Sequence, residues 1–180
     1  MQEAIEKGAP VVFITGCSIG GIGAAVRSLK SMEGIIHPNI LKLKVDVTSD
    51  ESVKNAIDYI YSECGRLDIL ISNAGLPGIG EPGDIVLRGV ARVTLYSLGP
   101  LLDASLDDVK KIMGTNYYGL IRLVNETIPR MAKRRFGLVV AIGSILGELG
   151  TPFTGLYNAS KAALHAYTET LRNGMHATRR

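Results

Sequence analysis

Tryptophan is absent from this 180-residue chain, aromatic residues make up only 6%, and there are just two cysteines. Cys17 and Cys64 stand alone without metal-type spacing, which argues against a disulfide framework and indicates a reducing compartment. No apolar run reaches the roughly 18 residues that a membrane helix needs. Residues 1–10 are polar and mixed in charge, so no signal peptide is predicted. We therefore expect a cytoplasmic protein, either soluble or attached peripherally to a membrane.

The composition indicates one globular domain that can bury a core. The chain is 46% hydrophobic and 21% charged, and its formal net charge is only +3. Four basic residues cluster where a helix is expected to end, a place that favours cations: Arg130, Lys133, Arg134 and Arg135. We interpret this cluster as a solvated helix end, and we expect neither a nucleic-acid partner nor a metal site.

Short apolar runs alternate with helical patterns along the chain. Strands are expected at 10–15, 40–46, 67–72 and 138–142, and helices at about 51–64, 105–134 and 154–172. Ser49 or Asp50 is suited to cap the first of these helices and Gly65 to end it, while Pro129 is suited to kink or divide the second. This alternation predicts an α/β fold with a parallel sheet and helices on both faces.

Tyr157 and Lys161 lie four residues apart, so a helix over 154–172 places them on one face. A cation beside a phenol favours the phenolate, and an unperturbed tyrosine has a pKa of about 10, so this help matters near neutral pH. Ser144 lies thirteen residues before Tyr157 and can hydrogen-bond a substrate oxygen. Together these residues are suited to proton transfer at an alcohol or carbonyl oxygen. Taken alone, the spacing also fits an ordinary helix with a surface tyrosine and lysine.

A glycine-rich turn at residues 15–23 lies directly between the first predicted strand and a following helix. Glycines let the backbone turn tightly and approach a pyrophosphate, and a helix N-terminus offers free N–H groups and a positive dipole end. A plain turn would also account for the glycines. The position after the first strand, however, is the one that a dinucleotide site requires.

Six motifs occur in the order found in short-chain dehydrogenases/reductases, and the chain resembles this family from about Val11 to its last helix. They are Thr15-Gly16…Gly21-x-Gly23, Asp46-Val-Thr48, Asn73-Ala-Gly75, Asn116, Ser144 and Tyr157-x-x-x-Lys161. The glycine turn and residues 144–165 also resemble the fungal branch of NADPH-dependent 1-acyldihydroxyacetone-phosphate reductases. The resemblance implies a doubly wound, Rossmann-type three-layer sandwich in which residues 1–180 form a single, incomplete domain.

The resemblance implies catalytic roles for four residues. Tyr157 would be the general acid in carbonyl reduction, and Lys161 would favour its phenolate and hold the nicotinamide ribose. Ser144 would orient the substrate oxygen. Asn116 would anchor a water in a proton relay to Lys161.

Contacts with a nicotinamide cofactor are implied as well. The implied cofactor-binding residues are Gly16, Ser18, Gly21, Ile22, Gly23, Arg27, Asp46, Val47, Asn73, Ala74 and Gly75, together with Tyr157 and Lys161. Asp46 would contact the adenine ring, with Val47 packing beside it. Arg27 would hold the 2′-phosphate of NADP, or it would lie on the first helix and point into water. We expect NADP(H) in preference to NAD(H).

The chain departs from the family pattern in three places. Only sixteen residues separate Gly23 from Ile40, where the family normally has a helix and a strand. Residues 76–98 look inserted, with a loop at 77–83 and an extra strand at 84–96. Only nineteen residues follow Lys161, where the family continues through further strands and a substrate loop. We therefore expect the sheet to lack its second and last strands.

The combined expectation is an NADP(H)-dependent oxidoreductase that reduces a carbonyl, or oxidises an alcohol, on a lipid-like small molecule. The substrate implied by the fungal branch is 1-acyldihydroxyacetone phosphate; a steroid, retinol or another hydrophobic alcohol is a rival. The alternative function is that of a truncated, non-catalytic isoform or fragment that binds nucleotide weakly or pairs with a full-length subunit. A complete fold would allow homo-oligomers, and the endoplasmic reticulum or lipid-droplet surface is an alternative location. His165 is expected to be packed or capped rather than catalytic.

Overall fold

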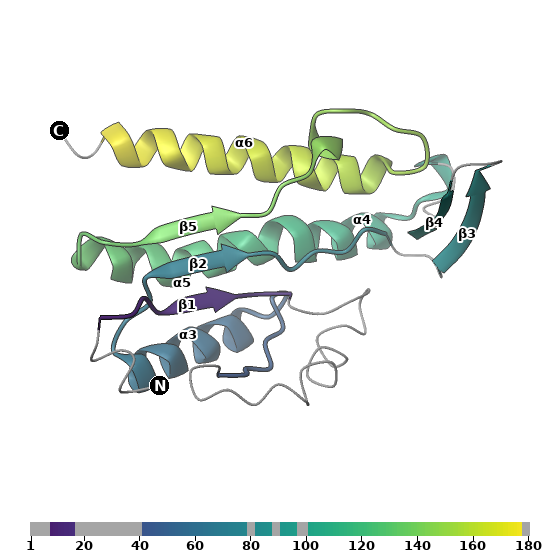
Figure 1. Cartoon of the computed structure of the whole chain (residues 1–180). Coiled ribbons are helices and arrows are strands. Elements are labelled where there is room, and N and C mark those ends of the chain that lie inside the picture. Colours follow the sequence, from purple (N-terminus) through teal and green to yellow (C-terminus); the bar gives the residue numbers. More distant parts are fainter. Residues whose placement is uncertain (1–7, 17–40, 79–81, 88–90, 97–100, 178–180) are drawn as a thin grey trace. The chain divides into compact units, whose positions relative to one another are not determined.

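The structure, a computed structural model, describes residues 8–16, 41–78, 82–87, 91–96 and 101–177 (Figure 1). The chain divides into two compact units. The first unit comprises Met1–Ala74 and Tyr118–Ile142, and the second comprises Gly75–Tyr117 and Gly143–Arg180. That the chain forms a single domain stays a prediction.

Three short parallel strands form the sheet of the first unit. They are β1 (Val12–Ile14), β2 (Ile69–Ser72) and β5 (Leu138–Ala141), in the order β1-β2-β5. Leu70 lies opposite both Phe13 and Val139, so the register is continuous across the sheet. The three strands point the same way, which brings their carboxyl ends to one edge (Figure 1). This confirms the parallel sheet and three of its four predicted strands.

Helix α3 (Asp50–Cys64) begins and ends as the sequence predicts. The side chain of Ser49 caps it by accepting a hydrogen bond from the backbone N–H of Ser52. Gly65 ends it with a φ of +69°, a left-handed conformation that glycine adopts without a steric penalty. The predicted apolar face is buried, with Val53 and Ile57 fully excluded from water.

The core of the first unit forms where α3, the strand β2 and helix α5 (Gly119–Lys133) meet. Its buried cluster consists of Val47, Val53, Ile57, Ile60, Leu67, Leu70, Leu123 and Met131. Burying one such side chain contributes about 1.5–3 kcal/mol, so the cluster stabilises this unit substantially. Ion pairs from Arg122 to Asp50 and from Arg130 to Asp58 join α5 to α3 at the surface.

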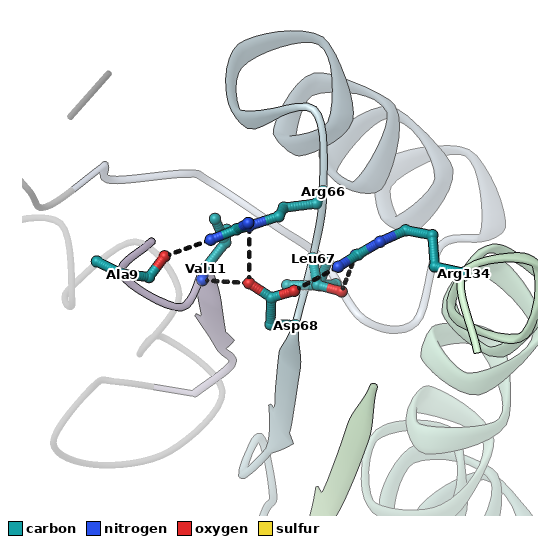
Figure 2. Close-up of polar contacts among 6 residues, drawn as sticks. All are labelled: Ala9, Val11, Arg66, Leu67, Asp68 and Arg134. Carbon is teal, nitrogen blue, oxygen red and sulfur yellow. Dashed lines mark hydrogen bonds and ion pairs between the residues drawn. The ribbon is translucent and has the colours of Figure 1, made fainter. Parts of the chain in front are cut away.

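A buried carboxylate ties the amino ends of the strands together (Figure 2). Asp68, only 3% exposed, accepts hydrogen bonds from the Val11 backbone N–H at 2.9 Å and from Arg134 Nη2 at 2.7 Å. Arg66 Nε forms an ion pair with the same carboxylate at 3.0 Å, and Arg66 Nη2 donates to the carbonyl oxygen of Ala9. The basic residues after α5 thus include an arginine that anchors the sheet.

The prediction of a strand at 40–46 is wrong for the described residues of that range. Residues 41–46 have no strand conformation, and Ile40 lies outside the described residues. The alternation of Leu43 and Val45 with lysines has another cause, because both apolar side chains pack against the core cluster of the first unit. Packing on a core requires the same alternation as a strand but no hydrogen-bonded neighbour.

The second unit contains a β-hairpin and several helical segments, and it carries the predicted catalytic residues. Strands β3 (Pro82–Leu87) and β4 (Ala91–Tyr96) pair antiparallel with each other. Helix α4 (Leu106–Met113) follows the 3₁₀ turn η1 (Leu101–Asp103) and packs against α6 (Gly155–Ala177), which also contacts the 3₁₀ turn η3 (Ile145–Gly147). The single extra strand predicted at 84–96 is thus a two-stranded hairpin, which pairs each strand with the other. Whether residues 76–98 are an insertion stays a prediction.

The long helix predicted over 105–134 is interrupted, but not at Pro129. Ser105 caps α4 and forms a reciprocal capping box with Asp108. A π-helical turn, η2 (Gly114–Tyr118), separates α4 from α5, and Pro129 lies inside α5. None of the described helices is both long enough and apolar enough to cross a membrane.

Candidate active site

Three of the predicted cofactor residues of the first unit, Gly16, Asn73 and Ala74, lie at the carboxyl ends of β1 and β2. Gly16 has a φ of +65°, and a Cβ at this position would lie 2.5 Å from the Cα of Ala74. Asn73 Nδ2 donates to the carbonyl oxygens of Thr15 at 3.2 Å and Gly16 at 2.9 Å. Thr15 Oγ1 accepts from the backbone N–H groups of Asn73 and Ala74. Only glycine therefore fits where the two strand ends approach each other.

Asp46 and Val47 occupy the turn that leads into α3. Asp46 Oδ1 accepts hydrogen bonds from the backbone N–H and the hydroxyl of Thr48, at 2.8 and 2.7 Å. Asp46 is exposed, whereas Val47 is 8% exposed and packs in the core beside Gly119. That Val47 packs beside a cofactor stays a prediction.

Besides Tyr157 and Lys161, the remaining predicted cofactor residues are Gly75 and five residues of the glycine turn and the segment after it. Gly75 is exposed and belongs to the second unit. The predicted contacts that lie outside the described residues are Ser18, Gly21, Ile22, Gly23 and Arg27.

All four predicted catalytic residues belong to the second unit. Tyr157 and Lys161 stand one turn apart at the start of α6, and Lys161 Nζ lies 5.7 Å from the centroid of the Tyr157 ring. That separation is within the range of about 6 Å for an attraction between a cation and an aromatic ring. Lys161 is only 5% exposed, and burial of its ammonium group lowers its pKa. The structure thus holds a buried lysine amino group beside the ring of Tyr157.

Asn116 lies in the π-helical turn η2 and joins three segments of the second unit. Its Oδ1 accepts from the backbone N–H of Leu76 at 2.6 Å, and its Nδ2 donates to the carbonyl oxygen of Leu76 at 3.0 Å. The same Nδ2 donates to Ser160 Oγ at 2.9 Å, and Ser160 Oγ donates to the carbonyl oxygen of Tyr157 at 2.7 Å. Both N–H groups of the amide donate hydrogen bonds within the protein. A water bound to this side chain would therefore have to donate its own hydrogen to Oδ1.

Ser144 is held in the segment that follows β5. Its Oγ accepts from the backbone N–H of Leu146 at 3.2 Å and caps η3, and its backbone N–H donates to His165 Nε2 at 3.3 Å. The hydroxyl serves as acceptor in the first bond, so its hydrogen remains able to donate to a substrate oxygen. His165 is packed against the Ser144 segment, as expected.

Sequence reasoning did not find Ser160 or the π-helical turn. Ser160 is fully buried and links Asn116 to the backbone of Tyr157. A polar residue directly before a functional lysine, on the buried side of a helix, is the signal that could have indicated it. A π-helical turn has no comparable sequence signal, although such turns are frequent at functional sites.

The chain matches the short chain dehydrogenase family over residues 2–179. It is 35% identical over 177 residues to a 3-ketodihydrosphingosine reductase of Bacteroides thetaiotaomicron, covering 92% of this chain and 58% of that protein. It is 33% identical over 177 residues to the NADPH-dependent 1-acyldihydroxyacetone phosphate reductase of Schizosaccharomyces pombe, covering 89% and 53%. The chain thus spans a little over half the length of these relatives.

The fold is also similar to that of a solved structure. A short-chain dehydrogenase from Streptomyces avermitilis superposes with a TM-score of 0.70 at 21% identity, covering 97% of this chain and 55% of that one. This likeness confirms the predicted doubly wound, Rossmann-type α/β fold. The family match over nearly the whole chain confirms the resemblance carried by the six motifs. The chain belongs to the short-chain dehydrogenase family.

Proposed function

We propose that the protein is an NADP(H)-dependent oxidoreductase that reduces a carbonyl group on a lipid-like small molecule. The observation that carries the proposal is the buried Lys161 ammonium beside the Tyr157 ring, at 5.7 Å from its centroid. Burying a charged group costs free energy. A lysine that is buried beside Tyr157 in spite of this cost favours a role for Lys161 in the chemistry of the Tyr157 hydroxyl.

The residues of the second unit divide the proton chemistry among them. The Ser144 hydroxyl donates a hydrogen bond to the substrate oxygen and holds it in place. Tyr157 donates its proton to that oxygen as negative charge develops there, and Lys161 stabilises the phenolate that remains. Asn116 and Ser160 fix the start of α6, so that Tyr157 does not have to be ordered during the reaction.

The described cofactor residues fit a dinucleotide. Ligands of open parallel sheets bind at the carboxyl ends of the strands, where exposed Gly16 and Asn73 lie. Asp46 would contact the adenine ring, and Asn73 and Ala74 would line the cofactor cleft. The role proposed for Lys161 is to hold the nicotinamide ribose. When bound, the nicotinamide supplies the hydride. NADP(H) is favoured over NAD(H) by the NADPH dependence in the name of the S. pombe relative and by the proposed role of Arg27.

Exposed apolar side chains of the second unit support a lipid-like substrate. Leu102 is 98% exposed, Leu106 77% and Phe153 58%. Leu101 lies against the first residue of α6, where a Cβ on Gly155 would be 2.8 Å from Leu101 Cδ1. Apolar surface therefore stands beside the helix end that carries Tyr157. The relatives named for 3-ketodihydrosphingosine and acyldihydroxyacetone phosphate favour the same substrate class.

The proposal also includes two properties of the protein as a whole. We expect it to form a homo-oligomer, and to associate peripherally with a lipid surface such as the endoplasmic reticulum or a lipid droplet.

Turnover with matched substrates tests the proposal. The purified chain is mixed with NADPH or NADH and with 1-acyldihydroxyacetone phosphate, 3-ketodihydrosphingosine or retinal, and loss of the reduced nicotinamide absorbance is followed. We expect oxidation of NADPH with one of the two acyl or long-chain ketones, and less with NADH. Binding of NADPH without turnover of any carbonyl would favour the alternative of a nucleotide-binding, non-catalytic chain. A chain that neither binds NADPH nor turns over would refute the proposal.

A further inference from the structure

His165 stands two turns after Tyr157 on α6 and contacts the segment that carries Ser144. Its Nε2 accepts a hydrogen bond from the Ser144 backbone N–H at 3.3 Å. To accept there, the neutral imidazole must carry its hydrogen on Nδ1. This side chain therefore has a defined tautomer and contacts the backbone of the residue assigned to hold the substrate oxygen.

Two glycines that bracket Ser144 leave the space that the imidazole occupies. A Cβ on Gly143 would lie 2.3 Å from His165 Nε2, and a Cβ on Gly147 would lie 2.9 Å from His165 Cε1. A Cβ on Gly147 would also come within 2.9 Å of the backbone carbon of Lys161. Neither glycine has a left-handed φ, since Gly8, Gly16 and Gly65 are the described glycines that do. Glycine is therefore required at positions 143 and 147 because the backbone there approaches α6 closely.

A second hydrogen bond fastens the same segment to the helix. Asn158 Nδ2 donates to the carbonyl oxygen of Leu149 at 3.0 Å. The segment from Gly143 to Leu149 is thus bound to α6 at both ends, by His165 near its start and by Asn158 near its end. On α6, Lys161 lies between these two points and Tyr157 directly precedes Asn158, so the same helix sets the positions of Ser144 and Tyr157.

We propose that His165 is a positioning residue: it holds the Ser144 backbone so that the serine hydroxyl and the Tyr157 hydroxyl meet one substrate oxygen. The role in turnover rests on the proposed reductase function. The hydrogen bond from the Ser144 amide to His165 does not depend on that function, because it is present in the protein without substrate. Removing the acceptor leaves the Ser144 N–H without its partner and lets the segment depart from α6.

Two substitutions separate the acceptor from the bulk of the side chain. His165→Leu keeps much of the volume and removes the acceptor, whereas His165→Gln keeps an acceptor near the position of Nε2. Glu169→Gln, at an exposed position of α6, serves as the control. Two properties are measured for each folded variant: NADPH-dependent turnover, and hydrogen exchange of the amide of Ser144 by NMR.

The acceptor role predicts a distinct pattern. In His165→Leu we expect kcat to fall about tenfold while the KM for NADPH changes by less than about twofold. The Ser144 amide should exchange about tenfold faster, and His165→Gln should recover most of both losses. If His165→Leu does not fold, His165→Asn, which retains polarity but places its acceptor closer to the helix, replaces it in both measurements.

Three outcomes decide between the claims. Unchanged Ser144 exchange in the leucine variant would overturn the positioning role. The same would follow if the leucine and glutamine variants lost turnover equally, since the acceptor would then be irrelevant. If the wild-type chain turns over no carbonyl but its Ser144 amide is protected through His165, the proposed reductase function fails and the holding role stands.

Discussion

The Asp68 carboxylate at the amino ends of the strands provides a sharp test of what holds the first unit together. Within the described part of the chain, the partners of this carboxylate are all N–H groups. Arg134 Nη2 donates to one oxygen, the Val11 N–H donates to the other, and Arg66 Nε forms an ion pair with that second oxygen (Figure 2). Asp68→Asn preserves the shape but replaces one oxygen with an NH₂ group. Whichever way the amide turns, this group must point at a donor.

The cost of this change follows from the burial of Asp68. Removing one partner of a buried ion pair costs about 3–5 kcal/mol, because the remaining charge is left uncompensated. Both arginine side chains are about 30% exposed and can regain water, so we take the lower end, about 3 kcal/mol. For a chain of this size, that loss lowers Tm by roughly 6–12 °C.

Urea and thermal unfolding, followed by circular dichroism, measure the loss. Asp107→Asn is the matched control, because Asp107 is 87% exposed in its ion pair with Lys110 and its loss should leave the urea midpoint unchanged. An Asp68→Asn variant as stable as this control would refute the assignment of the carboxylate as an anchor of the sheet.

The pH dependence supplies a second check on Asp68. Burial by itself raises the pKa of this carboxyl, but the hydrogen bonds from Arg134 and Val11 and the charges of Arg66 and Arg134 outweigh it and lower the pKa. A carboxyl with a lowered folded-state pKa stabilises the fold above its unfolded pKa of about 3.9. That contribution disappears as the pH falls from there through the folded-state value. Asp68→Asn should weaken this loss of stability in acid.

Three further variants test the sites of both units. Gly16→Ala should destabilise the fold much more than Gly65→Ala in urea unfolding: both glycines have a positive φ, but only at Gly16 would a Cβ collide with neighbouring backbone, so equal losses would contradict the packing. Ser160→Ala should cost about 1–3 kcal/mol, because it removes the buried acceptor of Asn116 Nδ2, and a double-mutant cycle with Asn116→Ala should show coupling. Lys161→Met should abolish turnover, since it removes the amino group beside the Tyr157 ring; a variant that keeps wild-type turnover would contradict this role.

The elements that the sequence predicted well are those whose signals are local. Helix α3 has its apolar face, its Ser49 cap and its Gly65 stop within one short stretch, and all three are found in the structure. The runs that became β1, β2 and β5 are short and apolar, as strands of a parallel sheet are. Tyr157 and Lys161 share a helix face because a spacing of four residues requires it.

The elements that the sequence did not predict depend on partners far along the chain. Leu43 and Val45 alternate with lysines because they pack on the core, and a strand needs in addition a hydrogen-bonded neighbour that a sequence pattern cannot supply. The π-helical turn brings Asn116 to Leu76 and Ser160, which are forty or more residues away. His165 contacts Ser144, which lies twenty-one residues before it in the chain. The imidazole occupies space that Gly143 and Gly147 leave open, and only the structure shows why glycine is needed at those two positions.

The central claim is that Tyr157 transfers a proton to a carbonyl oxygen beside Lys161, and one substitution tests it most directly. Tyr157→Phe keeps the ring and removes the hydroxyl. Steady-state oxidation of NADPH with the carbonyl substrate that the wild-type chain reduces best is measured for both proteins, together with the Kd for NADPH. We expect kcat to fall by about 10²–10⁴ with the Kd nearly unchanged, as for loss of a general acid. A phenylalanine variant that retains most of the wild-type kcat would contradict the account.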